Sequence, residues 1–236
     1  MSPYEVMLIT GILFVGGNLF GLIYSLIVLK TSIFTKFRIQ TKPYKDGVFK
    51  NRMPLYLFNF FILGTFGVLG SYLMYDFFDL EFSSIWVILG QIVFVAIVDD
   101  IWFYFMHRYM HTNKYLLKKI HSIHHRAHTP FPLEYLYVHP FEWMLGAIGT
   151  FGGYILIMIV MPLNVYAFWG FVLFRNLHEI HIHSDLNLPL FKWIPFLSPV
   201  EDHDVHHAKL DGNYASTFRF WDWAMNTRFK KENSAD

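Results

Sequence analysis

The chain has 236 residues with a formal net charge of +1, and it is 54% hydrophobic, 20% aromatic and only 16% charged. This composition is far from that of a soluble domain and indicates a membrane protein, while the near-zero charge argues against a nucleic-acid partner. The chain has no cysteine, which excludes disulfides, cysteine-ligated zinc and iron–sulfur clusters and leaves histidine and carboxylate side chains as strong metal ligands.

Apolar runs long enough to cross a bilayer core of about 30 Å occur at residues 6–29, 55–75 and 85–105. The first run is too long for a signal peptide and lacks its cleavage pattern, so we expect it to remain as a span. A fourth apolar region, residues 144–177, contains GAIGTFGG and is interrupted by Pro162, which predicts a tight pair of short helices packed against the others. The predicted fold is all-α, a multi-pass transmembrane helical bundle that forms a single domain over residues 1–236.

The basic residues predict the orientation of this bundle. The segment between the second and third spans, DFFDLEFSS, carries three acidic residues and no basic one. Lys and Arg gather instead in the other connections, so the positive-inside rule predicts that residues 30–53, 107–140 and 178–236 are cytoplasmic and that the N-terminus lies outside. Every histidine then falls on the cytoplasmic side, where segments 107–140 and 178–230 are expected to form a His-rich helical cap. A bacterial inner membrane and the endoplasmic reticulum both suit this pattern.

Histidine, with 13 residues, is over-represented, and two motifs repeat its spacing. In HSIHH (121–125) and HDVHH (203–207), the first, fourth and fifth positions share a helical face, so each motif is predicted to present three imidazoles to a common point. If the third span continues as a helix through HRYMH, then Asp100, Tyr104, His107 and His111 fall within roughly 60° of one another as one stripe. The segment LHEIHIHSD adds His178, His181 and His183 after the last apolar region.

Six imidazoles buried near hydrocarbon are costly unless each has a partner, so the two motifs indicate metal binding. Eight or more histidines exceed the needs of one zinc site and predict two metals, although the ligand type leaves Zn, Cu, Fe and Ni open. The chain lacks HExxH and the paired Glu-x-x-His helices of carboxylate di-iron bundles. A non-catalytic membrane metal-binding or transport protein is the alternative to an enzyme. We expect such a protein to place its ligands along the spans rather than on one side.

The motifs HRYMH, HSIHH, VHPFE, HSDLNLP, HDVHH and NYASTFRFWDWAMNT, in that order, resemble the fatty acid hydroxylase and sterol desaturase superfamily of integral-membrane di-iron oxygenases. The resemblance covers about residues 85–230. It implies two Fe ions, with Zn as a substitute in a recombinant sample, and the use of O2 to hydroxylate or desaturate a membrane lipid such as a fatty acyl chain or sterol. It also implies a separate electron-transfer protein, a cytochrome or a ferredoxin with its reductase, because the chain has no room for a fused one.

Carried over by position, the resemblance assigns nine metal ligands: His107, His111, His121, His124, His125, His183, His203, His206 and His207. Glu179 stands where a further histidine is usual, so Glu179 and His178 are both candidates for an extra ligand, and neither is preferred. No catalytic residue is expected beyond the ligands. Asp100, Tyr104, His139 and Asn213 are expected to support them, and Asp100 is expected to accept a hydrogen bond from a ligand imidazole. The alternatives are a salt bridge for Asp100 and a simple turn before Pro140 for His139.

Overall fold

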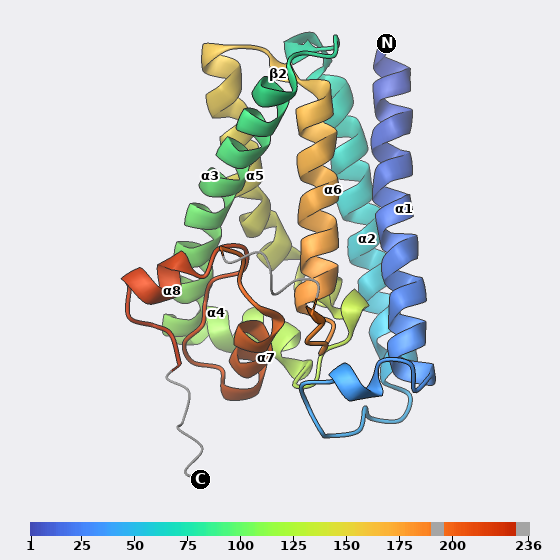
Figure 1. Ribbon diagram of the computed structural model, residues 1–236, viewed down its shortest axis with the longest axis vertical. Coiled ribbons are helices and arrows are strands. Elements are labelled where there is room, and N and C mark those ends of the chain that lie inside the picture. Colours follow the sequence, from blue (N-terminus) through green and yellow to red (C-terminus); the bar gives the residue numbers. More distant parts are fainter. Residues whose placement is uncertain (190–195, 230–236) are drawn as a thin grey trace.

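Long helices dominate the computed structural model, which describes residues 1–189 and 196–229. The elements are α1 (Pro3–Lys30), η1 (Thr35–Phe37), α2 (Val48–Leu73), η2 (Tyr75–Phe77), β1 (Phe78–Asp79), α3 (Ile85–Thr112), α4 (Lys114–Lys119), η3 (His121–Arg126), η4 (Pro132–Leu136), α5 (Pro140–Val160), β2 (Leu163–Asn164), α6 (Val165–Ile182), α7 (Val200–Lys209) and α8 (Phe220–Ala224) (Figure 1). The two short strands pair in parallel. The predicted all-α class is confirmed, whereas residues 190–195 and residue 230 of the expected cap lie outside the described residues.

Within residues 1–189 and 196–229, four helices are long and apolar enough to cross a membrane, namely α1, α2, α3 and α5. The three predicted spans at 6–29, 55–75 and 85–105 correspond to α1, α2 and the first part of α3. The start of α1 follows from its sequence, because Ser2 and Glu5 form a capping box and Pro3 occupies the first turn. Helix α3 continues through HRYMH to Thr112, as the histidine spacing predicted.

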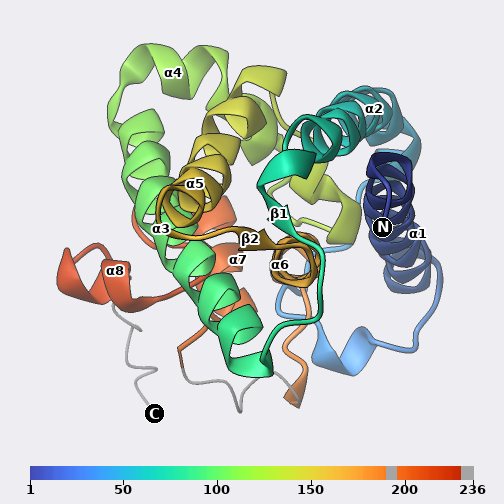
Figure 2. The same ribbon diagram turned by 90° about the horizontal axis from the view of Figure 1, so that it is seen from above.

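Helices α3 and α5 approach closely because α5 carries glycines where the two helices touch. A Cβ atom at Gly149 would lie 3.0 Å from the Cα atom of Asp99, and one at Gly153 would lie 3.1 Å from the Cα atom of Val95. Pro162 separates α5 from α6, as predicted, but the expected tight pair does not form. Helix α5 packs mainly on α3, and α6 lies in the middle of the bundle between α1 and α3 (Figure 2), because its small and aromatic residues face both neighbours.

The end of the bundle opposite the N-terminus carries a cap, which consists of α4, η3, η4, α7, α8 and their loops (Figure 1). Asp185, just after α6, joins the α1–α2 connection to this cap. Its carboxylate accepts hydrogen bonds from Arg38 Nε at 2.9 Å, from the backbone N–H of Gln40 at 2.8 Å and from the Tyr44 hydroxyl at 3.1 Å. Only His183 and Ser184 separate Asp185 from Ile182, the last residue of α6, so these hydrogen bonds also fix the end of α6 against the α1–α2 connection.

Candidate metal centre

The nine predicted ligands gather into two clusters within the cap. The first cluster comprises His107, His111, His121, His125 and His206, and the second comprises His124, His183, His203 and His207. Within each cluster, one nitrogen from every ring lies within 4.8 Å of the others. None of the nine residues is more than 9% exposed. Segments that are far apart in the sequence therefore meet at two buried points.

The prediction that each repeated motif aims three imidazoles at one point is wrong. His121 and His125 of HSIHH belong to the first cluster, whereas His124 belongs to the second. HDVHH is arranged in the opposite sense, with His203 and His207 in the second cluster and His206 in the first. The physical reason is that adjacent residues are rotated by about 100° on an α-helix such as α7 and by about 120° on a 3-10 helix such as η3, so the two adjacent histidines of each motif point in different directions. Each motif therefore connects the two clusters.

The rings face one another through their Nε2 atoms. In the first cluster, His121 Nε2 lies 2.8 Å from the Nε2 atoms of both His111 and His125. In the second, His203 Nε2 lies 3.1 Å from the Nε2 atoms of His183 and His207. Nitrogens bound to one ion at about 2.1 Å are separated from their neighbours by about 3 Å, so this spacing fits a metal ion in each cluster.

Hydrogen bonds at the opposite ring nitrogen orient several of these histidines. The Nδ1 atoms of His107 and His206 each lie 2.8 Å from a backbone carbonyl oxygen, that of Tyr214 and that of Gly212 respectively. Donation from Nδ1 leaves the Nε2 lone pair free to bind a metal. His206 Nε2 is buried and lacks a hydrogen-bond partner, which is costly unless an ion satisfies it.

Burial favours the neutral form of four clustered histidines, which is the form that binds metals; these are His121, His124, His183 and His207. It lowers the pKa of His121 and of His183 to about 3. Burial also holds the pKa of His124 and His207 well below the ordinary value, with neighbouring imidazoles adding to the effect. Protons therefore compete weakly with a metal ion for these nitrogens near neutral pH.

A carboxylate that the sequence analysis did not single out supports the first cluster. Glu142, in the first turn of α5, places its Oε1 atom 2.8 Å from His121 Nδ1. The residue is the last of the VHPFE motif, and this motif is the feature of the sequence from which its role could have been inferred. His139 of the same motif instead caps α5, where its Nδ1 accepts a hydrogen bond from the backbone N–H of Phe141 at 3.1 Å. His139 therefore marks the turn before Pro140 and lies outside both clusters.

Asp100 does not receive a hydrogen bond from a ligand imidazole, which corrects the expectation. Its Oδ1 atom accepts the backbone N–H groups of Thr217 and Phe218, each at 3.1 Å, because the C-terminal segment crosses α3 at this level. Among the described residues Asp100 also forms no salt bridge. Tyr104 likewise holds the C-terminal segment, through a 2.8 Å hydrogen bond between its hydroxyl and Thr227 Oγ1. Asp100 and Tyr104 therefore hold the C-terminal segment in place and do not contact a ligand imidazole through a hydrogen bond.

Asn213 acts through the backbone on either side of it. Its side chain donates to the carbonyl oxygen of Asp202 at 2.9 Å and accepts from the backbone N–H of Phe229 at 3.0 Å. The flanking residues Gly212 and Tyr214 supply the carbonyl groups that orient His206 and His107. Asn213 has a φ of 50°, a left-handed conformation that asparagine tolerates better than most residues.

Neither candidate for the extra ligand belongs to a cluster. His178 directs Nε2 to the carbonyl oxygen of Ser216, 3.1 Å away. The Glu179 carboxylate pairs with Arg175 and accepts a hydrogen bond from Ser216 Oγ at 2.7 Å. The backbone carbonyl of Glu179, rather than its side chain, supports the site, because it lies 2.7 Å from His183 Nδ1.

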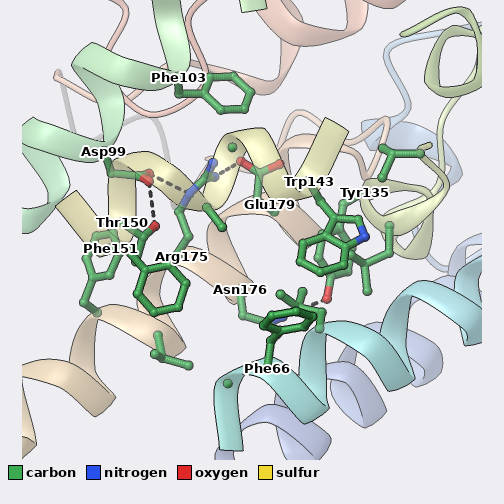
Figure 3. Close-up of a pocket in the computed structure, with 18 of the residues that line it drawn as sticks. Phe66, Asp99, Phe103, Tyr135, Trp143, Thr150, Phe151, Arg175, Asn176 and Glu179 are labelled. Atoms are coloured by element: carbon green, nitrogen blue, oxygen red, sulfur yellow. Dashed lines mark hydrogen bonds and ion pairs between the residues drawn. The ribbon is translucent and has the colours of Figure 1, made fainter. Parts of the chain in front are cut away.

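A cavity of about 270 Å³ extends from between the helices to the histidines. Members of both clusters line its inner end: His107, His121, His124, His183 and His203. Most of its remaining wall is apolar, and Asp99, Arg175 and Glu179 in that wall are paired with one another (Figure 3). Arg175 Nε lies 2.9 Å from Asp99 Oδ2, and Thr150 donates to Asp99 Oδ1 at 2.6 Å.

Comparison with known proteins gives consistent matches. Residues 92–227 match the fatty acid hydroxylase family. Methylsterol monooxygenase 1 of Rattus norvegicus is 34% identical over 178 residues, which is 72% of this chain and 59% of the relative. The Danio rerio protein of the same name is 33% identical over 90% of this chain and 77% of the relative.

Another relative carries a different name. The very-long-chain aldehyde decarbonylase GL1-11 of Oryza sativa subsp. indica is 32% identical over 214 residues, 86% of this chain and 78% of the relative. The chain spans only 53% to 59% of three of the methylsterol monooxygenases that it matches. No solved structure matches the chain.

Proposed function

Because the chain belongs to the fatty acid hydroxylase family, we propose that it is an integral-membrane oxygenase that oxidises a lipid at two metal ions held by the nine clustered histidines. One observation carries this proposal: histidines of both clusters line the inner end of a single apolar cavity. A metal-storage or metal-transport protein has no use for an apolar cavity that ends at its metals. The catalytic unit in this proposal is the whole described bundle, within a single domain of residues 1–236.

Iron is the metal that we propose for both clusters, with zinc as a substitute in recombinant samples. Side chains alone do not oxidise an unactivated C–H bond, and imidazole ligands suit iron. Bound iron would supply the activation of O2, and a separate cytochrome, or a ferredoxin with its reductase, would supply electrons. The nine clustered histidines would hold the ions, while His178 and Glu179 stay outside the ligand set because their side chains already have other partners.

The protein contributes orientation and exclusion of water. Backbone carbonyls of Gly212, Tyr214 and Glu179, together with the Glu142 carboxylate, fix the rings of four ligands. The apolar cavity binds the hydrocarbon part of the substrate and keeps water from the inner end. The substrate we propose is a sterol or a fatty acyl lipid, and hydroxylation is preferred to desaturation because the relatives include proteins named monooxygenases.

We propose that the histidine cap faces the cytoplasm and that the N-terminus lies on the other side. The cap and the α1–α2 connection carry many basic residues, among them Lys42, Lys45, Arg108, Lys118 and Arg126. The short connection at the opposite end, residues 74–84, is acidic. A bacterial inner membrane and the endoplasmic reticulum are both compatible with this arrangement.

Untargeted lipid mass spectrometry on cells that express the protein tests the proposal. The His206→Ala variant removes a ligand of the first cluster, and His139→Ala, which changes a histidine outside both clusters, is the matched control. We expect a lipid that gains one oxygen with the intact protein and with His139→Ala but not with His206→Ala. Loss of two hydrogens would indicate desaturation instead. Two bound irons with no change in any lipid, when substrate and electron donor are supplied, would favour the metal-binding alternative.

A further inference from the structure

The exposed residues of the cavity wall indicate where the cavity reaches the surface of the bundle. Among its lining residues only Phe66 and Phe151 are exposed, at 53% and 37%. Phe66 lies on α2 and Phe151 on α5, so the cavity opens between these two helices. In the view of Figure 3, the side chains of Phe66 and Phe151 both lie below that of Glu179.

This opening lies at the depth of the membrane interior. Phe151 is eleven residues from the first residue of α5 and nine from its last, since α5 is Pro140–Val160. At 1.5 Å per residue, the opening is about 17 Å from the first residue of α5 and about 14 Å from its last. Leu69, Ile148 and Ile155 are exposed nearby on the same two helices. The opening therefore faces hydrocarbon rather than water.

The seam between α2 and α5 is held by few contacts. Phe66 and Trp143 meet edge to face, with ring centroids 6.0 Å apart. A Cβ atom at Gly70 would lie 3.9 Å from the Phe151 ring, and one at Gly67 would have no neighbour within 4 Å. The seam between α3 and α5 is different, because there a Cβ atom at Gly149 would collide with α3 backbone. The α2–α5 seam thus has room at Gly67 for a guest molecule.

We propose that the seam between α2 and α5 is the entrance through which the apolar end of a neutral membrane lipid passes from the bilayer to the histidines. This inference rests on the proposed function for the chemistry at the inner end of the cavity. A neutral lipid is favoured because the charged side chains in the wall already have partners: Asp99, Arg175 and Glu179 pair with one another, and Glu142 contacts His121. A charged headgroup would find no partner inside and would stay at the membrane surface.

Photolabelling of the purified protein in lipid nanodiscs, in the absence of O2, tests the entrance. The probe is a long-chain alcohol with a diazirine at the end of its tail, and label is read by mass spectrometry on Met110. This residue lines the cavity and is only 1% exposed, so it is reached only from inside. We expect Gly67→Trp to reduce Met110 labelling about tenfold, because the indole would fill a preformed opening.

Gly90→Trp is the matched control. Gly90 is also a glycine of a spanning helix with no neighbour within 4 Å of a Cβ atom, but it lies on the outer face of α3 and does not line the cavity. We expect its labelling to equal that of the unchanged protein. Equal labelling of Met110 in Gly67→Trp and Gly90→Trp would overturn the proposed entrance.

A second variant covers the case in which Gly67→Trp does not fold. Phe66→Ala removes an exposed ring from the opening, and Phe94→Ala removes an exposed ring from α3 that does not line the cavity. We expect Met110 to be labelled about threefold faster in Phe66→Ala only, and an unchanged rate would contradict the entrance. Labelling needs no metal, O2 or electron donor. A protein that takes up the probe but oxidises no lipid would keep the entrance and reject the proposed function.

Discussion

His121 donates its Nδ1 hydrogen to Glu142 across 2.8 Å, and this contact joins the first histidine cluster to the first turn of α5. The same helix packs against α3, which carries His107 and His111. One carboxylate therefore links the orientation of a ligand to the packing of two membrane helices.

Replacement of Glu142 is expected to weaken metal retention. Glu142→Ala leaves His121 Nδ1 without its acceptor, and loss of such a partner typically lowers metal affinity about 10- to 100-fold. Metal analysis after dialysis against a series of chelator concentrations measures the effect. Glu81→Ala, which changes an exposed glutamate at the opposite end of the bundle, should retain metal like the unchanged protein. Equal retention by both variants would show that His121 does not depend on Glu142.

Adjacent histidines are expected to control different metal ions. His124 shares a cluster with His207, whereas His125 belongs to the other cluster. A double variant of His124 and His207 to Ala leaves two histidines in the second cluster and should keep about one metal per chain. A double variant of His125 and His207 to Ala leaves four histidines in the first cluster and three in the second, and should keep about two. Metal analysis of purified protein distinguishes the two. Identical metal content in the two double variants would contradict the division of HSIHH between the clusters.

The close contact between α3 and α5 predicts that adding a single methyl group at the contact destabilises the protein. Gly149→Ala would place Cβ 2.9 Å from the Trp102 Cβ atom and 3.0 Å from Asp99 backbone, which should destabilise the protein by about 1–3 kcal/mol. Gly152→Ala, on the same helix, meets only Val98 Cγ1 at 4.0 Å and should be neutral or slightly stabilising. Thermal unfolding in detergent compares them. A Gly149→Ala melting temperature at or above that of Gly152→Ala would refute the close contact.

The metal-free protein should lose stability as pH falls. Burial lowers the pKa of His121 and His183 from 6.5 to about 3 in the folded state. Between these values the unfolded chain binds more protons than the folded chain, so the free energy of unfolding decreases as pH falls from 6.5 towards 3 and is unaffected by these groups above 6.5. Melting temperatures of chelator-treated protein across this window measure the effect. A flat profile below 6.5 would mean that these rings are not buried as neutral groups.

Local patterns determined most of the architecture. Apolar runs of sufficient length predicted α1, α2 and the start of α3, because a bilayer imposes a minimum length on any span. Pro162 marked the break before α6, and glycines at Gly149 and Gly153 marked a close helix contact. The partner in that contact was not predictable, since a glycine on one helix does not specify which neighbour approaches it.

The sequence by itself indicated that the six histidines of HSIHH and HDVHH gather, because imidazoles that are costly to bury near hydrocarbon need a common partner, and the resemblance of its motifs to a known family added His107, His111 and His183. Only the tertiary structure decided how they divide. His124 and His125 are neighbours in the chain, yet their rings point to different clusters because of their rotation about η3 and the packing of α7 against the cap. The roles of Glu142 and Asp100 were decided in the same way. Each depends on which distant segment crosses its helix, which is set by packing of the whole bundle and leaves no local pattern.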